Sequence, residues 1–445
     1  MTIETMHIGL DDTDSTKGGC TTYLTAVLIE QLKKFNVEYI DYPGLIRLNP
    51  NVPWKTRGNG ALCLRFKYPT EFEDQIKETA MELWEEHSAK QEKGTDPGIV
   101  LYKSARISED LKAYAKKTET TVVKLKEATA LIQKLGAEAA GFNSCRGMIG
   151  ALAAIGETLE GDYTYELIAY RTPENLGTKR RVDASSIFEM DKVTEPYTFN
   201  NVDDKKGRVI ITPRGPDPIL FGIRGESAEI IKKAFSIIKP LEPMERWVIF
   251  RSNQGTDAHL KTAKLGEVEP YSSIIAEGTV SKEPWIVPLR HVIFSIRDDS
   301  AEVDCAAYEP TGDLRKVARE LIIGDVVQVY GAVHCATASK PVTINLEKID
   351  ILRLASPVKA ENPFCPNCGK RLKSMGKNQG FGCERCGDKY PQLKKVELPV
   401  PRVLKPSLYM TSTRSQRHMT KPLRRYGLEK RGVSPFPLVD EWHSP

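Results

Sequence analysis

The chain has 445 residues, of which 40% are hydrophobic and 28% charged, and its formal net charge at pH 7 is only +5. This composition excludes a disordered or fibrous chain, and the length predicts three or four domains. No apolar run approaches the roughly 18–20 residues of a membrane span, and no signal-peptide pattern opens the sequence. The nine cysteines are an odd and dispersed set, which suits the reducing cytoplasm better than a disulfide framework.

Strand-like and helical patterns alternate over the first 140 residues, which predicts an α/β domain at residues 1–140. The expected strands span residues 6–10, 37–42, 45–48 and 61–66, and the expected helices span residues 22–35, 71–89 and 122–135.

Directly after the first strand, three carboxylates fall within four positions, at Asp11, Asp12 and Asp14. Like charges this close repel one another, so a fold keeps them together only if a cation neutralises them or water solvates them. Oxygen ligands of this kind suit Mg²⁺, and Gly18 and Gly19 would let backbone N–H groups approach a phosphate. A polar turn with a helix N-cap is the alternative. We favour a metal–nucleotide site, because a turn needs one aspartate rather than three.

The hydroxyls of Thr21 and Thr22 open the helix that follows the three aspartates, which we call the acidic loop (residues 11–14). A second loop, the basic loop (residues 55–60), precedes the strand at 61–66. Lys55 and Arg57 would clamp phosphates, the arginine as a bidentate fork and the lysine as a point charge. A charged turn is the alternative for the basic loop.

A second unit is predicted at residues 141–252, with helices at 146–156 and 227–238 and strands at 163–170, 209–212 and 219–223. That order suits a small split-βαβ sandwich. Arg146 and Arg224 each stand near a helix start, where the macrodipole favours anions; plain capping, with Ser227 as N-cap, is the alternative. The polar segment 253–268 is a candidate linker.

Five strand-like runs with one helix between the third and fourth predict an OB-fold at residues 270–355, with a generic β-domain as the alternative. The runs span residues 274–280, 291–296, 301–308, 325–333 and 342–352, and the helix spans 313–321.

Two CxxC pairs, fourteen residues apart, predict a zinc ribbon at residues 360–395. Cys365, Cys368, Cys383 and Cys386 present four thiolates for tetrahedral, structural zinc, and two disulfides are the alternative. The tail at residues 396–445 is basic: residues 398–428 contain seven Lys or Arg and no acidic residue. We therefore expect this tail to bind a polyanion.

Seven blocks, in this order, closely resemble the archaeal tRNA-isoleucine agmatinylcytidine synthetase (TiaS) family. They are GLDDTDS (9–15), CTTY (20–23), IRLNP (46–50), KTRGNG (55–60), RGMIGALAA (146–154), ELIAYR (166–171) and FGIRGES (221–227). The likeness covers nearly the whole length, including the OB-like region and the zinc knuckles.

The resemblance implies a multidomain chain of α/β and α+β type, with an atypical kinase-like domain, a ferredoxin-like domain, an OB-fold and a zinc ribbon. It implies a ligase that joins agmatine to carbon-2 of the wobble cytidine of tRNA-Ile, so that the tRNA reads AUA. ATP is consumed to AMP and pyrophosphate, and the cytidine oxygen is phosphorylated before agmatine displaces it. The autophosphorylated threonine of the family falls on Thr21, and its metal-binding run falls on Asp11, Asp12 and Asp14.

These arguments together define the expected site, with ATP, Mg²⁺ and structural Zn²⁺ as cofactors. The expected residues are Asp11, Asp12, Asp14, Thr21, Lys55 and Arg57 for catalysis, Gly18, Gly19, Thr22, Asn59, Gly60, Arg146 and Gly147 for the nucleotide, and Glu166, Arg171 and Arg224 for agmatine. We expect the OB-fold and zinc ribbon to hold the acceptor arm of the tRNA while the N-terminal half works on the anticodon. A non-enzymatic single-strand binder and a ligase using another amine, such as lysine, are the alternatives.

Overall fold

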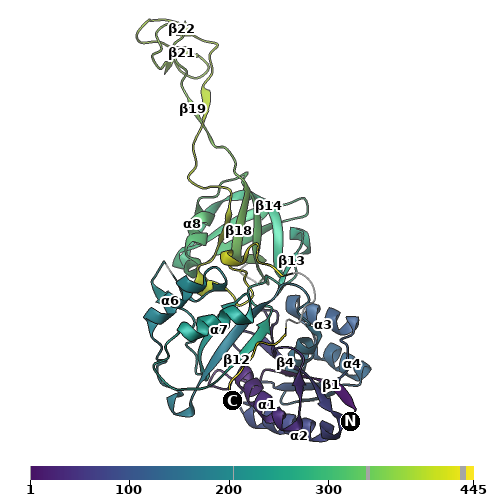
Figure 1. The fold of residues 1–445 in the computed structure, drawn as a ribbon. Coiled ribbons are helices and arrows are strands. Elements are labelled where there is room, and N and C mark those ends of the chain that lie inside the picture. Colours follow the sequence, from purple (N-terminus) through teal and green to yellow (C-terminus); the bar gives the residue numbers. More distant parts are fainter. Residues whose placement is uncertain (1, 204, 337–340, 431–436) are drawn as a thin grey trace.

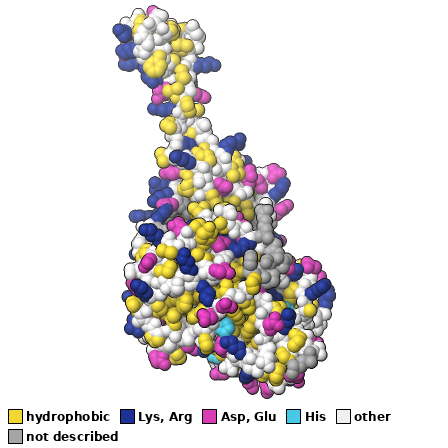
Figure 2. Space-filling view, viewed as in Figure 1, with side chains coloured by type: hydrophobic (Ala, Val, Ile, Leu, Met, Phe, Trp, Pro, Cys, Tyr) yellow, Lys and Arg dark blue, Asp and Glu magenta, His cyan; other side chains and the backbone are white. Residues whose placement is uncertain are grey.

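The computed structural model describes residues 2–203, 205–336, 341–430 and 437–445. The remaining positions, which fall within the predicted ranges 1–140, 141–252, 270–355 and 396–445, lie outside the described residues. Two lobes lie side by side at the base of the molecule, a β-barrel sits above them, and a small ribbon projects at the end of a two-stranded stalk (Figure 1). The space-filling view shows the same elongated outline (Figure 2).

Both basal lobes are built on one continuous sheet, with strand order β6-β5-β1-β4-β3-β12-β7-β11-β8 and β2 paired to β4. The strands are β1 (Ile3–Asp11), β2 (Glu38–Tyr39), β3 (Gly44–Arg47), β4 (Gly60–Pro69), β5 (Gly98–Lys103), β6 (Glu138–Gly141), β7 (Thr164–Arg171), β8 (Thr198–Phe199), β11 (Ile219–Gly225) and β12 (Met244–Ser252). β1 is antiparallel to both neighbours, β4 and β5. The lobes join where β12 runs parallel to β3, so the C-terminal strand of the second lobe completes the sheet of the first.

The helices of the first lobe are α1 (Thr21–Leu32), α2 (Glu73–His87), α3 (Glu109–Thr120), α4 (Leu125–Leu135) and α5 (Gly147–Gly156). α1 packs against α2, whereas α5 packs against β1, β4, β5 and α3. We expected the small-residue helix α5 to open the second unit. In the structure it is buried along almost its whole length against strands of the first lobe, so the two units share this helix as a common surface.

The second lobe carries α6 (Ala184–Thr194) and α7 (Ala228–Ile237), which pack against each other. The Ser227 hydroxyl accepts a hydrogen bond from the Ile230 N–H, so the predicted N-cap is confirmed. The strand predicted at 209–212 is reduced to β10 (Arg208–Val209), which pairs with β9 (Val202–Asp203) outside the main sheet.

The barrel consists of β13 (Leu260–Thr262), β14 (Ser273–Val287), β15 (His291–Arg297), β16 (Glu302–Ala307), β17 (Val326–His334) and β18 (Thr343–Arg353). The order β14-β15-β16-β18-β17 closes on itself because β14 also pairs with β17. Helix α8 (Asp313–Arg319) lies between β16 and β17 in the chain. The five predicted strands and the predicted helix of this region are confirmed.

The candidate linker at 253–268 runs from β12 to the barrel; its residues 253–256 are buried, whereas most of residues 261–267 are exposed. Asn253, Gln254 and His259 are all buried. Each side chain pairs with a carboxylate of a different part of the molecule: Asn253 with Glu119 (2.7 Å), Gln254 with Glu166, and His259 with Glu347 (3.2 Å). The segment is polar because it joins three parts through buried hydrogen bonds.

The stalk is formed by β19 (Val358–Glu361) and β23 (Val396–Pro399), and it carries β20 (Lys373–Ser374), β21 (Phe381–Gly382) and β22 (Lys389–Tyr390) of the ribbon. Beyond the stalk the chain returns to the body, where β24 (Leu408–Met410) pairs with β18. None of the helices in the described part of the chain is long and apolar enough to cross a membrane.

The tail turns much of its positive charge inward. Arg402 pairs with Asp325 of the barrel (2.5 Å), and Arg425, which is fully buried, pairs with Asp162 (2.8 Å) and Glu226 (2.5 Å). The prediction that the whole tail offers its charge to a polyanion is therefore wrong for these two arginines, because internal carboxylates already neutralise them.

Candidate active site

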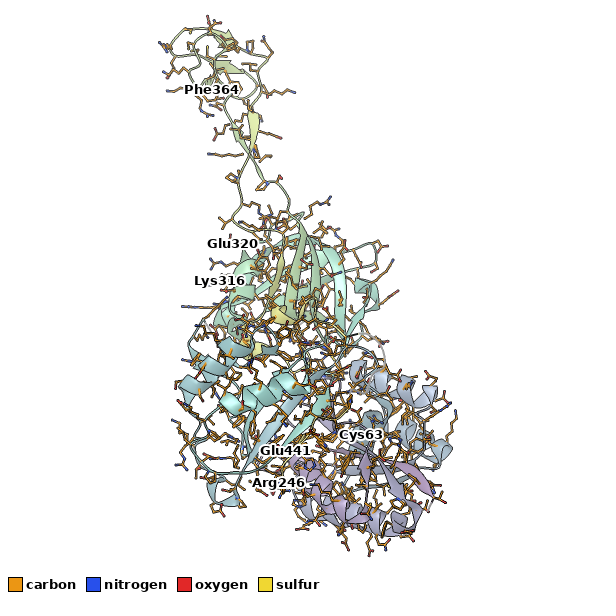
Figure 3. All side chains as sticks on the ribbon, viewed as in Figure 1. Cys63, Arg246, Lys316, Glu320, Phe364 and Glu441 are labelled. Carbon is orange, nitrogen blue, oxygen red and sulfur yellow. The ribbon has the colours of Figure 1, made fainter. Side chains whose placement is uncertain are left out.

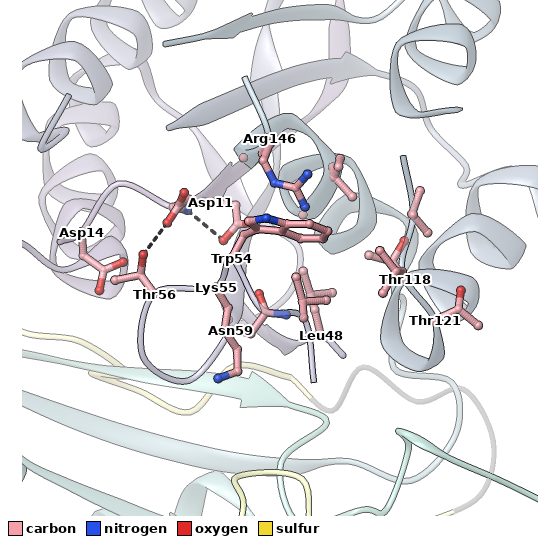
Figure 4. Close-up of a pocket in the computed structure, with 18 residues that line it drawn as sticks. Asp11, Asp14, Leu48, Trp54, Lys55, Thr56, Asn59, Thr118, Thr121 and Arg146 are labelled. Atoms are coloured by element: carbon pink, nitrogen blue, oxygen red, sulfur yellow. Dashed lines mark hydrogen bonds between the residues drawn. The ribbon is translucent and has the colours of Figure 1, made fainter. Parts of the chain in front are cut away.

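The acidic loop follows β1 and is held by hydrogen bonds to distant parts of the chain (Figure 4). An oxygen of Asp11 accepts a hydrogen bond from the Asp12 N–H (2.8 Å). Asp12 accepts one from the Thr56 hydroxyl (2.9 Å) at one oxygen and one from the Asp96 N–H (2.8 Å) at the other. Asp14 forms an ion pair with Arg57 (2.6 Å). The three carboxylates of the loop therefore lie close enough to repel one another, and each is held by a different partner.

Burial and mutual repulsion make these carboxylates reluctant to ionise. Burial, followed by the charge of Asp12, raises the pKa of Asp11 well above its ordinary value. Burial also raises the pKa of Asp12 to about 6 and raises the pKa of Asp14, although Arg57 opposes the change at Asp14. A bound cation would favour the ionised forms, and the all-oxygen donor set fits Mg²⁺.

Helix α5 fits over this loop only because its residues are small. A Cβ atom at Gly150 would lie 1.9 Å from a carboxylate oxygen of Asp11. A Cβ atom at Gly147 would lie 2.8 Å from the Asp11 carbonyl oxygen. The small-residue run at 146–156 therefore lets a helix backbone approach the carboxylates closely.

Cavity A opens beside the acidic loop (Figure 4). It is lined by Asp11, Asp12, Asp14, Leu48, Val52, Trp54, Lys55, Thr56, Asn59, Gly60, Thr118, Thr121, Val122, Val123, Arg146, Gly147, Ile149 and Gly150. The Arg146 guanidinium stacks on the half-exposed Trp54 indole, 4.2 Å from the ring centre. With these two side chains across its centre, the free volume of cavity A is only about 80 Å³.

Cavity B adjoins cavity A and lies between the two basal lobes. Its volume is about 450 Å³, and its lining includes Asp14, Cys20, Thr21, Thr22, Arg47, Thr56, Arg57, Gly58, Asn59, Gly60, Glu166, Asp217, Arg224, Gln416 and His418. The two cavities share Asp14, Thr56, Asn59 and Gly60. A group bound in one cavity would therefore be separated from a group in the other by only a few side chains.

Thr21 is the first residue of α1, and its hydroxyl lies in cavity B next to the acidic loop. It accepts a hydrogen bond from the hydroxyl of Thr13 (3.0 Å), which belongs to the same loop. The Thr22 hydroxyl contacts Cys20 Sγ (2.9 Å). The predicted neighbourhood of Thr21, Thr22 and Asp14 is therefore present.

Glu166 lies on the wall of cavity B that the second lobe provides. One of its oxygens accepts a hydrogen bond from Arg224 (3.0 Å), and the other accepts one from Gln254 and lies 4.0 Å from Arg47. Burial alone would raise the pKa of Glu166, but Arg224 and Arg47 hold it below its usual value. Arg224 also donates to Nδ1 of His418 (2.9 Å) in the tail.

Several predicted residues lie apart from this centre. Arg171 is buried in an ion pair with Glu242 (2.5 Å) and lines neither cavity A nor cavity B, so the structure does not bring it together with Glu166 and Arg224. Gly18 and Gly19 also line neither cavity, and the Gly19 carbonyl accepts a hydrogen bond from Arg57 (2.9 Å).

The Gly147 N–H and the Lys55 side chain, which we expected to contact phosphate groups, are oriented differently. The Gly147 N–H already donates to the Asp96 carbonyl (2.8 Å). The Lys55 side chain extends away from the acidic loop toward the tail (Figure 4). Asn59, Gly60 and Arg146 do line cavity A.

Sequence reasoning missed residues that reach the site from far along the chain. Asp96 holds Asp12 through its N–H, and Asp217 pairs with both Arg57 (3.0 Å) and Arg180 (3.0 Å). Trp54 and His418 line the cavities but stand in no recognisable motif. Only Thr56 had a local signal, because it lies between Lys55 and Arg57 in the predicted loop.

The four cysteines of the ribbon converge as predicted (Figure 3 shows the ribbon at the far end of the stalk). Their sulfur atoms lie within 4.8 Å of one another. Gly369 and Gly387 adopt φ of 68° and 78°, and their N–H groups close the two knuckles on the carbonyls of Cys365 and Cys383. All four are free cysteines, and Cys368 and Cys383 are 3.5 Å apart, so the disulfide alternative is wrong. The donor set fits structural zinc.

Family models match three stretches of the chain. They are described as the TiaS TCKD domain over residues 7–144, the TiaS FLD domain over residues 145–259 and the TiaS C-terminal zinc ribbon domain over residues 362–404.

Known proteins are similar over nearly the whole chain. The tRNA-isoleucine 2-agmatinylcytidine synthetase TiaS from Methanosarcina mazei is 43% identical over 94% of this chain and 97% of its own length. A crystal structure of TiaS in complex with its isoleucine tRNA and ATP has 40% identity and a TM-score of 0.83, covering 95% of this chain and 97% of that one. A complex of TiaS with the same tRNA, AMPCPP and agmatine has 38% identity and a TM-score of 0.82 over the same shares.

Proposed function

Because the chain belongs to the TiaS family, we infer that it is a tRNA-isoleucine 2-agmatinylcytidine synthetase. It uses ATP to join agmatine to carbon-2 of the wobble cytidine of an isoleucine tRNA. Relatives at 41–43% identity carry this name, and TiaS structures of the same fold hold the isoleucine tRNA with ATP, or with AMPCPP and agmatine.

The observation that best supports this function is the shared wall of cavities A and B. Cavity A contains the acidic loop, cavity B contains Thr21, and Asp14, Thr56, Asn59 and Gly60 belong to both. We propose that cavity A receives the triphosphate and that cavity B receives the cytidine and agmatine. This division would bring a phosphate donor next to the base that it activates.

Substitution at carbon-2 of cytidine requires activation, because a ring oxygen is a poor leaving group until it is phosphorylated. In this proposal Asp11, Asp12 and Asp14 hold Mg²⁺, which supplies charge stabilisation at the phosphates. Arg57 neutralises Asp14 and Asp217 in the structure and would turn toward phosphate oxygens when a nucleotide enters. Arg146 stands at the start of α5 and lines cavity A, where it would contact the nucleotide.

The target cytidine must leave its stack to reach cavity B, at a cost of a few kcal/mol. Agmatine is dicationic, so it requires acceptors in the same cavity. Glu166 and Arg224 line that cavity, but the carboxylate oxygens of Glu166 are already engaged by Arg224 and Gln254. We therefore propose that Glu166 orients Arg224, and that Asp217, which Arg57 would release on turning toward the phosphates, is the carboxylate nearest to the bound amine.

We propose the domain divisions as kinase-like at 1–140, ferredoxin-like at 141–252, an OB-fold at 270–355, a zinc ribbon at 360–395 and a tail at 396–445. The closed order β14-β15-β16-β18-β17, with α8 between the third and fourth strands, supports the OB-fold assignment. Free cysteines among the described residues and a tRNA substrate support action in the cytoplasm.

Mass analysis of a tRNA-Ile transcript after incubation with ATP, Mg²⁺ and either agmatine or lysine tests the function. We expect the mass increase of agmatine addition, and none with lysine. In a parallel reaction with labelled ATP, we expect phosphate on Thr21 in the parent and none in Thr21→Val, with Thr22→Val as the control. Transfer of lysine, or full modification by an Asp12→Asn variant, would contradict the proposed chemistry.

A further inference from the structure

A third cavity, cavity C, lies between the basic loop of the first lobe and the returning tail. Its volume is about 440 Å³, and four cationic side chains line it: Arg47, Lys55, Arg57 and Arg417. Its described lining contains no acidic residue. The cavity thus has an excess of positive charge and an opening large enough for a small anion.

The four cations differ in how far they are already neutralised. Arg57 is paired with Asp14 (2.6 Å) and Asp217 (3.0 Å), and Arg417 is paired with Glu347 (3.3 Å). Arg47 lies 4.0 Å from Glu166, and its buried Nε has no hydrogen-bond partner. Lys55 contacts only the Arg57 carbonyl (3.4 Å) and has no acidic partner among the described residues. Arg47 and Lys55 therefore retain donors that a ligand could use.

The crowding of cations also affects the groups around them. Burial, and then the charge of Arg417, lowers the pKa of Lys55. The charge of Arg47, burial, and the charges of Arg224 and Lys55 hold the pKa of His418 well below its usual value, so this imidazole is neutral. Its Nδ1 accepts from Arg224, which leaves the proton on Nε2. The neutral His418 side chain therefore offers an N–H donor next to cationic side chains that repel one another when no anion is bound.

The neighbours of cavity C indicate which anion it would hold. It shares Arg47, Arg57, Gly58 and His418 with cavity B, but only Leu48 and Lys55 with cavity A. Both RNA and ATP present phosphate oxygens, and the larger overlap favours the ligand that enters cavity B.

We propose that cavity C binds a backbone phosphodiester of the tRNA beside the flipped wobble nucleotide, with Arg47 and Lys55 supplying the unpaired donors and Arg417 supplying the contact from the tail. This inference rests on the proposed function, which places that nucleotide in cavity B. The tail would then complete the RNA site through Arg417. The backbone next to Arg417 is fixed, because the Gly255 and Asp257 N–H groups donate to the carbonyls of His418 and Met419 (both 2.8 Å).

The test is the salt dependence of tRNA-Ile binding without ATP, measured for the parent, Arg417→Gln and Arg402→Gln. Arg402 is the matched control, since it is also a tail arginine paired to a barrel carboxylate, Asp325, but lies outside cavity C. Losing one phosphate contact should reduce the slope of log K against log[salt] by about 0.7–0.9. We expect that reduction in Arg417→Gln, with several-fold weaker binding at low salt, and an unchanged slope in Arg402→Gln.

Two further measurements keep the result interpretable. Lys55→Gln breaks no ion pair among the described residues, so it should reproduce the smaller slope without the structural cost of removing the partner of Glu347. The KM for ATP in tRNA-independent phosphorylation of Thr21 should stay unchanged in Arg417→Gln. Equal slopes in all variants, or a raised KM for ATP with an unchanged slope, would overturn the proposal. Agmatine transfer by the parent at saturating tRNA tests the proposed function separately.

Discussion

Asp12→Asn is predicted to stabilise the protein while abolishing its activity. The Asp12 carboxylate is partly buried near Asp11, Asp14 and Asp96, and its desolvation raises its pKa from 3.8 to about 6. The folded state therefore binds the Asp12 proton more tightly than the unfolded state does. Ionisation of Asp12 therefore lowers the free energy of unfolding. This effect is absent below about pH 4, develops as the pH rises from 4 to 6, and is complete above pH 6.

The size of this effect follows from the pKa change. One pKa unit corresponds to about 1.4 kcal/mol, so ionised Asp12 lowers the free energy of unfolding by about 3 kcal/mol at pH 7.5. Asparagine carries no charge but loses one of the two acceptors that face Thr56 and Asp96, which costs about 1 kcal/mol. We expect a net gain of about 2 kcal/mol at pH 7.5 without Mg²⁺, and a loss of about 1 kcal/mol near pH 4.

The assay is thermal or urea unfolding at both pH values, with and without Mg²⁺, alongside tRNA modification. Asp110→Asn is the control, because Asp110 is exposed and Lys134 holds its pKa below its usual value, so its removal should bring no gain at pH 7.5. Mg²⁺ should stabilise the parent and leave Asp12→Asn unchanged. Lower stability of Asp12→Asn at pH 7.5 without Mg²⁺ would refute this electrostatic reasoning.

Three other predictions follow from the cavities and the ribbon. Gly150→Ala should raise the KM for ATP at least tenfold, because its Cβ would lie 1.9 Å from a carboxylate oxygen of Asp11. Gly161→Ala is the control, since a Cβ there meets nothing within 4 Å, and it should leave the KM unchanged. Equal KM values for the two variants would contradict the packing argument. ATP should change the tryptophan fluorescence of the parent but not of Trp54→Phe, since the Trp54–Arg146 stack must open to admit a nucleotide. An unchanged parent signal at saturating ATP would show that the stack stays closed. Zinc removal, or Cys383→Ser, should weaken tRNA binding while Thr21 phosphorylation persists, because the ribbon lies at the end of the stalk, far from the acidic loop (Figure 1). Loss of both tRNA binding and Thr21 phosphorylation would contradict that separation.

Local patterns predicted the parts of the molecule that depend on short stretches of sequence. The acidic loop, the zinc knuckles and the strands of the barrel each follow from residues within a few positions of one another. The two CxxC pairs could be interpreted because a tetrahedral thiolate site demands that spacing.

Long-range contacts could not be predicted in the same way. Asp96 and Asp217 complete the acidic site from 84 and more residues away, and Arg425 is buried against Asp162 and Glu226. The tail has the composition of a polyanion-binding segment, and composition does not reveal which carboxylates face each cation. For the same reason the polar segment at 253–268 resembled a linker, although His259 and Asn253 are buried against partners.

The central claim is that the acidic loop holds the metal of a nucleotide whose phosphates activate an RNA base. Its most direct test is a crystal structure with a non-hydrolysable ATP analogue and Mn²⁺, in which anomalous scattering locates the metal. We predict a peak at about 2.0–2.3 Å from oxygens of Asp11, Asp12 or Asp14, with the triphosphate extending toward Thr21. A metal and nucleotide bound away from these carboxylates would contradict the account.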